Sequence, residues 1–429
     1  MNYRLGLILF TLLLAVNLGK ENNSPYVKRG LAAVDRSACI ELVNGIMSVG
    51  SFDSEKAKTI LRQLHLLHPD LTMAFLKQKV TAIEDDFMFY RSFVPYFYKK
   101  LELKLPELGV SDSLLSIKGK AIGDLHMDNF GALVKNESKL FYGVNDPDYA
   151  NKIPMFSDAL RYFTGLYLNN KKLKKDEFKK IVKAYYAGLK NDLSDVKTPK
   201  SVKKLSTSIL SAPEDEISSL GKLVREVKKF RIPQELDSSE LTTFKNMIEQ
   251  KLGSSIEIGD SFKFMNVTGG SGGYMRYRFL IKLPTNSDFL PSRQIIELKE
   301  IPENLKLPFS EGEVGLDETI DTYFKIEDPS LRKFYGVLRG ENTDFLMRPR
   351  WAELDFPRVS SMTGNKKQKF LEYQASLIGT YHRNSLQGST GFDNYLGEIA
   401  ELKAKSWREW SKVMAESINK DFKNLKSSE

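Results

Sequence analysis

Residues 123–131 read Gly123-Asp-Leu-His-Met-Asp-Asn-Phe-Gly131, and this run, the motif segment, constrains the architecture more than any other part of the chain. It places the carboxylate of Asp124 five positions before the amide of Asn129. A carboxylate can accept the proton of an attacking hydroxyl, and an amide oxygen can bind a metal ion. The motif segment therefore indicates a site that combines proton transfer with metal binding.

Two further carboxylates follow in Val144-Asn-Asp-Pro-Asp148, a short stretch that we expect to be extended. Mg²⁺ prefers oxygen ligands and keeps some of its waters, so Asn129 and Asp146, assisted by Asp148, are candidate ligands. The alternative is a plain turn, because Asn-Asp-Pro-Asp is also a favourable turn sequence.

The spacing within the motif segment is the one that kinase catalytic loops use between their Asp and their Asn. The first hypothesis is therefore phosphoryl transfer, with Asp124 as the base and Asn129 as a metal ligand. We expect His126 to bond to the loop backbone and Asp128 to be a solvated loop residue. Asp158, near the start of a helix, is expected to cap that helix or to brace the loop.

A glycine turn connects two expected strands further along the chain. It consists of Gly269, Gly270, Ser271, Gly272 and Gly273. Glycines allow backbone N–H groups to approach a phosphate closely, although an ordinary hairpin loop is the alternative. Lys299 lies one strand further on among apolar residues, where kinases carry the Lys that contacts nucleotide phosphates. This arrangement favours the phosphate interpretation.

Other cations could line the same pocket. Arg91 interrupts an aromatic stripe between Phe87 and Tyr98, and we expect it to point into a pocket. Arg348 and Arg350 are candidate phosphate contacts, as is His382 on a late helix. For each of them, an ordinary surface or core role is the alternative.

Composition excludes several kinds of site. The chain has 429 residues, a net charge of +9, 41% hydrophobic and 28% charged residues, as in ordinary globular proteins. A single cysteine, Cys39, excludes a disulfide framework and a cysteine-based zinc site within one chain, and four histidines make a His-rich metal site unexpected. The basic excess indicates either a solvated surface or an acidic partner such as nucleotide, nucleic acid or anionic lipid, without a specific nucleic-acid signal.

The N-terminus has the pattern of a secretory signal. A short basic start precedes an apolar run from Leu5 to Val16 and a polar exit, with Gly19 as the nearest cleavage candidate. We therefore expect a signal peptide over residues 1–19 and export, to a bacterial periplasm, with no membrane span once it is removed. An uncleaved membrane anchor and a buried helix are the alternatives.

Hydrophobic periodicity then predicts the elements. Helices are expected over Glu55–Leu67, Leu71–Leu101, from Ser157 or Asp158 onward, over 173–250 and over 366–424. Strands are expected within 116–147, and over Ser261–Val267, Tyr274–Leu283 and Gln294–Ile301. The order predicts an α+β protein with a small antiparallel sheet against a larger helical body.

The same order of expected helices and strands divides the chain into segments. A loose leader is expected over residues 20–34, a helical lobe with the motif segment over 35–254, and a sheet-rich lobe with the glycine turn over 255–360. The C-terminal helices of 361–429 are expected to pack on the helical lobe. The oligomeric state is left open.

Taken in order, these motifs resemble the bacterial domain-of-unknown-function 2252 family over roughly residues 80 to 420. The shared set is Gly-Asp-x-His-x-x-Asn-Phe-Gly, Asn-Asp-x-Asp, a glycine-rich turn with a later Leu-Lys-Glu, Phe-Leu-x-Arg-x-Arg and a late His-Arg. Two departures stand out. Pro147 replaces the usual Phe of the second motif, and the Arg of the late motif is displaced to Arg383.

The family's catalytic-loop motif is similar to that of aminoglycoside phosphotransferases and choline kinases, which implies a protein-kinase-like fold of two lobes. By that resemblance Asp124 is the base, Asn129 and Asp146 are metal ligands and Lys299 contacts phosphate. Ordinary kinases carry the glycine-rich loop and the Lys before the catalytic loop, whereas here both follow it. Either the fold is circularly permuted, or the later motifs are coincidental.

The resulting hypothesis is an ATP- and Mg²⁺-dependent phosphotransferase that acts on an unknown small-molecule or protein hydroxyl. One alternative is an exported, non-catalytic pseudokinase that binds a nucleotide or phosphate ligand, since ATP is scarce outside the cytoplasm. Another is a metal-dependent phosphohydrolase that directs the same carboxylates at water.

Overall fold

The computed structural model describes most of the chain beyond residue 50. The described residues are 51–136, 139–205, 216–225, 233–283, 293–301, 307–311, 316–324, 326, 328–341, 343–351, 356–387 and 390–427. The expected signal peptide, the leader and Cys39 lie outside them. None of the described helices is long and apolar enough to cross a membrane.

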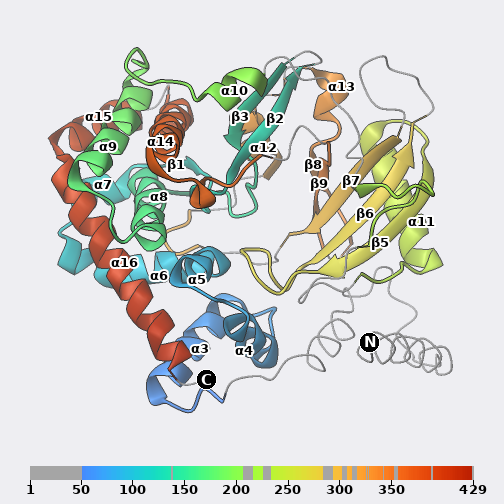
Figure 1. Ribbon diagram of the computed structural model, residues 1–429, viewed down its shortest axis with the longest axis horizontal. Helices are drawn as coiled ribbons and strands as arrows, with labels where there is room; N and C mark the ends of the chain where they lie inside the picture. Colours follow the sequence, from blue (N-terminus) through green and yellow to red (C-terminus); the bar gives the residue numbers. More distant parts are fainter. Residues whose placement is uncertain are drawn as a thin grey trace.

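Helices gather on one side of the molecule and a five-stranded sheet on the other, so the mixed α+β class is confirmed (Figure 1). The helical body contains α8 (Met155–Asn169), α9 (Lys175–Lys190), α10 (Lys200–Leu205), α14 (Gly364–Leu386), α15 (Thr390–Glu401) and α16 (Ala404–Lys426). Within this body α14 lies along α9, and α16 crosses α8. Gly188 and Gly379 permit the close approach, because a Cβ atom at either position would collide with backbone of the facing helix.

The N-terminal part of the described chain adds shorter helices. They are α3 (Glu55–Leu67), α4 (Met73–Thr81), α5 (Asp86–Ser92), α6 (Val94–Leu108) and α7 (Asp112–Ser116). The first matches its expected bounds, but the single helix expected over Leu71–Leu101 is wrong. Asp85 caps a new helix by accepting the N–H of Met88 at 2.6 Å, and Pro95 opens another, where its missing N–H costs nothing.

The helix expected to begin at Ser157 or Asp158 starts earlier. The residue before α8 is Pro154, with no side-chain cap, and Asp158 lies inside the first turn. Its carboxylate is therefore available for another task, described below.

Five antiparallel strands form the sheet, in the order β5-β6-β7-β9-β8. Their bounds are β5 (Glu257–Met265), β6 (Met275–Lys282), β7 (Arg293–Glu300), β8 (Gly336–Leu338) and β9 (Phe345–Pro349). The first three confirm expected strands. Helix α11 (Ser238–Leu252) covers one face, where its Phe244 packs on Tyr277, Phe279 and Phe345 with ring centroids 4.4 to 5.6 Å apart.

Because successive side chains of a strand point to opposite faces, the other face of this sheet carries a different set of residues. In β6 the face away from α11 holds Arg276 and Arg278, and in β7 it holds Glu297 and Lys299. One face is thus apolar and covered by a helix, whereas the other is charged.

Two small hairpins place the candidate loops together. Strand β1 (Lys118–Ala121) pairs with β4 (Asn151–Pro154), and β2 (Phe130–Asn136) pairs with β3 (Lys139–Val144). The chain leaves β1 to enter β2 and leaves β3 to enter β4. Since β1 and β4 are partners, as are β2 and β3, the two connecting loops must run side by side. The first loop carries the motif segment, and the second carries the acidic residues of Val144-Asn-Asp-Pro-Asp148.

Candidate functional site

Asn129 joins the two loops. Its Nδ2 donates to the carbonyl of Asp124 at 2.7 Å and to the carbonyl of Asp146 at 2.9 Å. Its Oδ1 is buried and has no hydrogen-bond partner among the described residues. The amide is therefore oriented by its nitrogen, and its oxygen is left for a ligand.

Asp124 is held by an arginine that sequence reasoning missed. One carboxylate oxygen accepts from Arg161 Nη2 at 2.6 Å, and Arg161 is fully buried in α8 over the ring of Tyr90. Burial raises the pKa of Asp124, and Arg161 opposes part of that rise. No motif revealed this partner, because Arg161 lies inside an otherwise apolar helix.

Asp158 and His382 lie behind the motif segment. Asp158 accepts the backbone N–H groups of Ile122 and Gly123 at 3.2 and 3.0 Å, so it braces the loop and does not cap a helix. His382 contacts Asp158 through Nε2 at 3.3 Å and Tyr185 through Nδ1 at 2.8 Å. The structure thus places His382 in a buried polar layer under the site and away from the cleft surface.

Asp128, which we expected to be solvated, is buried and paired. Its side chain is 1% exposed and accepts from Arg91 at 3.0 Å and from the N–H and hydroxyl of Ser360 at 2.9 and 2.6 Å. His126 accepts the N–H of Asp128 at 3.2 Å, and burial holds the pKa of His126 well below its usual value. Asp128 therefore connects the motif segment to Arg91 and to a distant segment of the chain.

The acidic pair, Asp146 and Asp148, meets Lys299 from the charged face of the sheet. Lys299 is 1% exposed and lies 2.8 Å from Asp146 Oδ1, and it also bonds to Asp148 Oδ2. Burial alone would raise the pKa of Asp146, but Lys299 and nearby arginines outweigh it and lower that pKa. Asp148 Oδ1 is buried without a hydrogen-bond partner in the described part of the chain.

The glycine turn is held at three points by other elements. The contacts are Ser92 Oγ with the N–H of Gly269 (3.0 Å), Tyr149 OH with the carbonyl of Gly270 (2.8 Å) and Lys79 Nζ with the carbonyl of Gly272 (2.9 Å). The turn is therefore a fixed part of the cleft wall.

Two adjacent amides of this turn remain for a ligand. The N–H groups of Gly270 and Ser271 donate to no group within the described residues, and both residues line the cleft. A Cβ atom at Gly270 would lie 3.2 Å from Asp124 Oδ2, so the turn touches the carboxylate of the motif segment. Consecutive free amides form a concavity that favours anions.

An arginine ladder crosses the charged face of the sheet around the buried carboxylate of Glu297. It comprises Arg276 and Arg278 of β6, and Arg348 and Arg350 at the end of β9. Glu297 lies 2.9 Å from Arg276, 2.7 Å from Arg348 and 3.3 Å from Arg278, while Arg350 bonds to Glu216 at 2.6 Å. The period-two spacing of these arginines could have revealed the ladder, but only two of them were singled out from the sequence.

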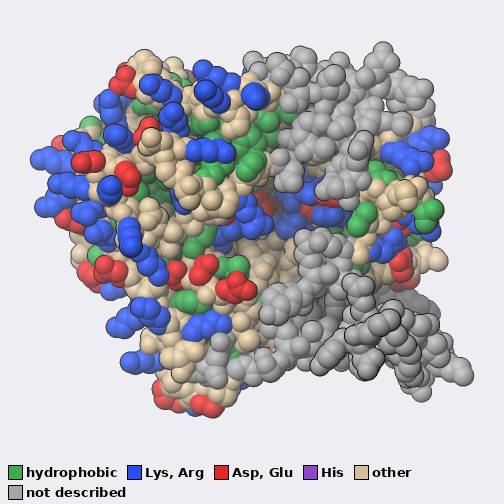
Figure 2. Space-filling model, in the orientation of Figure 1, with side chains coloured by type: hydrophobic (Ala, Val, Ile, Leu, Met, Phe, Trp, Pro, Cys, Tyr) green, Lys and Arg blue, Asp and Glu red, His purple; other side chains and the backbone are tan. Residues whose placement is uncertain are grey.

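These groups line one cleft of about 390 Å³ between the helical body and the sheet. Figure 2 shows Lys, Arg, Asp and Glu side chains in this hollow. Of the residues expected at the site, the cleft is lined by Arg91, Asp124, His126, Asn129, Asp146, Asp148, Gly269, Gly270, Ser271, Arg348 and Arg350. Gly272, Gly273, Lys299, Asp158 and His382 lie beside or beneath it.

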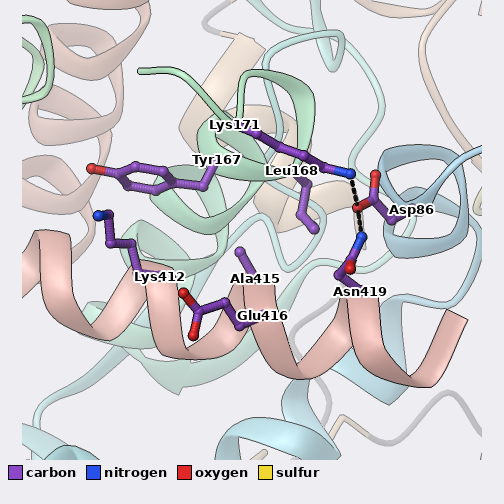
Figure 3. A pocket seen from close by; sticks show the side chains of 8 residues that line it. All are labelled: Asp86, Tyr167, Leu168, Lys171, Lys412, Ala415, Glu416 and Asn419. Carbon is purple, nitrogen blue, oxygen red and sulfur yellow. Dashed lines mark hydrogen bonds and ion pairs between the residues drawn. The ribbon is translucent and has the colours of Figure 1, made fainter. Parts of the chain in front are cut away.

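A second pocket, of about 270 Å³, lies between α5, α8 and α16 (Figure 3). Its Asp86 carboxylate is already bonded to Lys171 and Asn419. None of the residues of the motif segment lines it, so the cleft is the candidate functional site.

The cleft suits a hard cation held by few protein ligands. Among the described residues, no three His, Cys, Asp or Glu side chains form a metal-binding group. Oδ1 of Asn129 and Oδ1 of Asp148 are buried and have no hydrogen-bond partner among the described residues, and both are oxygen ligands of the kind that Mg²⁺ prefers. The carboxylate of Asp146 lines the same cleft. The donor set therefore fits Mg²⁺ and does not fit zinc.

No curated protein and no solved structure matches the chain. A family model matches part of it, shorter than the stretch over which the motifs predict the resemblance. The match contains the motif segment and the acidic pair but neither the glycine turn nor the arginine ladder. Residues 74–250 match the model of the family described as "Uncharacterized protein conserved in bacteria (DUF2252)", which supports the resemblance over that segment.

Proposed function

We propose that the cleft binds Mg²⁺ and the phosphates of ATP, and that the protein transfers a phosphoryl group to a hydroxyl of a small molecule or a protein. One observation carries the proposal. Oδ1 of Asn129, Oδ1 of Asp148 and the N–H groups of Gly270 and Ser271 have no partner within the part of the chain that the structure describes, and all four residues line the same cleft. Ligand oxygens for a cation and N–H donors for a phosphate are thus combined in one place.

Each group has a role in this chemistry. Asp124 is the candidate base, and burial raises its pKa, which makes it a better proton acceptor than an exposed carboxylate. Gly270 and Ser271 would donate to phosphate oxygens, and Lys299 would move from the acidic pair toward them. When bound, Mg²⁺ would neutralise the charge that develops on the transferred group.

We also propose that the architecture is a circularly permuted, kinase-like pair of lobes. The sheet with the glycine turn and Lys299 follows the motif segment in the chain, yet Lys299 bonds to both members of the acidic pair. Lobes are assembled by packing and not by chain order, so a permuted sequence can build the same cleft.

A non-catalytic binding protein is the second candidate, and two contacts favour it. Arg161 occupies one oxygen of Asp124, and Lys299 occupies the acidic pair, so ion pairs already satisfy much of the catalytic set. Under this reading the protein is an exported pseudokinase that recognises a nucleotide or a phosphate ligand.

The first experiment is thermal unfolding with ATP, in the presence and absence of Mg²⁺. Binding to the native state raises stability by about 2.7 kcal/mol at a ligand concentration of roughly 100 Kd. We expect stabilisation by ATP with Mg²⁺ and a smaller effect without it. Asn129→Ala should lose the Mg²⁺-dependent part, whereas the exposed control Asp176→Asn should keep it. The absence of any shift at millimolar ATP would refute the proposal.

Asp124→Asn separates the two candidates. A phosphotransferase should lose about 10²- to 10⁴-fold in turnover, because general-base assistance is removed, while ATP still stabilises the variant. Hydrolysis of ATP and phosphorylation of a hydroxyl pool are measured together. If the wild-type protein binds ATP but shows no turnover above that of Asp124→Asn, the pseudokinase reading replaces the enzyme.

A further inference from the structure

We propose that the arginine ladder is a second phosphate subsite, and that it recognises a phosphate group on a small-molecule partner of the nucleotide. This inference rests on the proposed function, because it names the class of the second substrate in the same cleft. It concerns a group of residues that neither the motif segment nor the metal candidates require.

Charge is the first argument. The four guanidiniums of the ladder face three carboxylates: Glu297 and Glu216 bond to them, and Asp146 lies 3.9 Å from Arg348. Arginine is not deprotonated in proteins, so the wall keeps an excess of positive charge at any physiological pH. Keeping cations in a half-buried wall is unfavourable unless an anion compensates them.

Unused donors are the second argument. The guanidinium of Arg350 bonds to Glu216, and its Nε is buried without a partner in the described part of the chain, as is Nε of Arg276. Each guanidinium carries several N–H groups in a planar fork that matches the oxygens of phosphate. All four side chains line the cleft, so their guanidiniums lie within reach of a phosphate bound there.

Position along the sheet separates only the far end of the ladder, at Arg278 and Arg350, from the acidic pair, because Arg348 lies 3.9 Å from Asp146 and Arg276 donates to Ser271 Oγ. Lys299 lies opposite Arg276, Glu297 lies between Arg278 and Arg348, and the N–H of Arg350 bonds to the carbonyl of Ile295. Residues 295 and 299 of one strand are therefore roughly 13 Å apart at about 3.3 Å per residue. A phosphate beside Lys299 cannot also contact the far end of the ladder.

The aromatic neighbours point the same way. Phe264 lies under Arg278, with the guanidinium carbon 5.3 Å from the ring centroid, and it also lines the cleft. Stacking on a ring fixes the plane of a guanidinium and leaves its edge for bidentate bonds. The far end of the ladder, at Arg278 and Arg350, thus combines charge and oriented donors with a position away from Lys299 and the acidic pair.

The test titrates inorganic phosphate and glycerol 3-phosphate into the full protein by calorimetry, first without Mg²⁺ or nucleotide. Glycerol is the matched ligand without phosphate. Arg350→Gln should weaken phosphate binding about tenfold or more, as expected for a lost charge-assisted bond. Arg339→Gln, an exposed arginine after β8 that pairs with Asp344, should bind as the wild type does.

Arg350→Gln is chosen because it should leave the folded structure and its stability unchanged. Glu297 keeps its three closest arginines, and Glu216 keeps Arg278. Thermal unfolding verifies this directly. Arg278→Lys is the second variant: it retains the charge but loses the planar fork, and we expect an intermediate loss of affinity.

A second titration, with ATP and Mg²⁺ at saturation, distinguishes the subsite from the nucleotide's own phosphates. We expect glycerol 3-phosphate to bind with unchanged or higher affinity than in the absence of ATP. Competition by ATP would overturn the inference, as would phosphate binding that is absent or equal in wild type and Arg350→Gln. Failure of the proposed function looks different: phosphate binds to the ladder, but ATP and Mg²⁺ neither bind nor stabilise.

Discussion

Each of the two walls of the cleft buries a carboxylate against arginine, but the number of arginines around the carboxylate differs. On the helical wall, Asp124 faces one arginine, Arg161, and burial leaves the pKa of Asp124 raised. On the sheet wall, Glu297 is surrounded by the arginine ladder. Burial again opposes ionisation, but Arg348 and its neighbours hold the pKa of Glu297 well below its usual value.

The difference separates two tasks. A carboxylate with a raised pKa exchanges a proton easily and suits acid–base chemistry. A carboxylate held ionised by an excess of cations acts as a structural anion that keeps those cations in place. Under the proposed function, the helical wall would handle protons and a metal ion, and the sheet wall would bind anions.

The largest expected effect comes from neutralising the carboxylate of the sheet wall. Glu297→Gln leaves buried arginines without their counter-ion, so the free energy of unfolding should fall by about 3 to 5 kcal/mol. Urea unfolding measures this loss, and the exposed Glu257→Gln on the same sheet is the control. Asp124→Asn, the equivalent change on the helical wall, should cost less, because the fold already disfavours ionised Asp124. Equal losses in the two variants would contradict the comparison.

Removing the cation of the helical wall should have the next largest effect. Arg161→Met leaves Asp124 buried and unpaired, and we expect a loss of about 2 to 3 kcal/mol at neutral pH. Asp124 can then take up a proton in the folded state at a pH where the unfolded chain has lost it. Folded protein therefore binds more protons, stability falls as pH rises, and the deficit should be smaller at pH 5 than at pH 8. Unfolding midpoints of Arg161→Met and the wild type across this pH range test the prediction. A stability loss that does not depend on pH would mean that the loss does not come from the ionisation of Asp124.

The contact between Lys79 and the glycine turn, one of the three that hold the turn, can be tested separately. Burial lowers the pKa of Lys79 from 10.5 to about 7, although Lys79 donates to the carbonyl of Gly272. Below pH 7 the folded protein must carry a buried charge; between pH 7 and pH 10.5 the unfolded chain binds more protons. Wild-type stability should therefore rise over that window relative to Lys79→Met, by up to about 1.4 kcal/mol for each pH unit. A constant difference between the two proteins from pH 6 to pH 10 would show that Lys79 keeps its ordinary pKa.

The smallest effect is expected where the two walls touch. Gly270→Ala would place a Cβ atom 3.2 Å from Asp124 Oδ2 and 3.3 Å from the carbonyl of Arg91, which should cost about 1 kcal/mol. The control Gly259→Ala has its nearest neighbouring atom at 3.8 Å and should be close to neutral. Equal stability of the two variants would mean that the walls are further apart than the contact implies.

Much of the fold follows from local patterns. Alternation predicts the first three strands of the sheet, and the helical period predicts α3 to its exact bounds. The break of the expected helix over Leu71–Leu101 was missed, because a cap at Asp85 and a proline at Pro95 outweigh a continuous apolar period. Both signals, a capping residue and a proline, are present in the sequence.

The sequence predicts the candidate site less completely than the fold. Asp124, Asn129 and the acidic pair stand out because they lie in short runs of chemically capable residues. Arg161 and Glu297 do not stand out, since neither lies in a short run of chemically capable residues and their partners are distant in the chain. Asp128 was misjudged because a loop position indicates exposure, whereas partners distant in the chain bury it.

The sequence by itself determined which residues could do chemistry and which elements carry them, because spacing, glycines and periodicity act over a few neighbouring positions. Only the tertiary structure decided which of them meet. Pairing of β1 with β4 and of β2 with β3 brings the motif segment beside the acidic pair, and packing of the sheet against the helical body brings Lys299 and the arginine ladder to face them. Charge partners selected across that distance depend on burial and geometry, which no local pattern encodes.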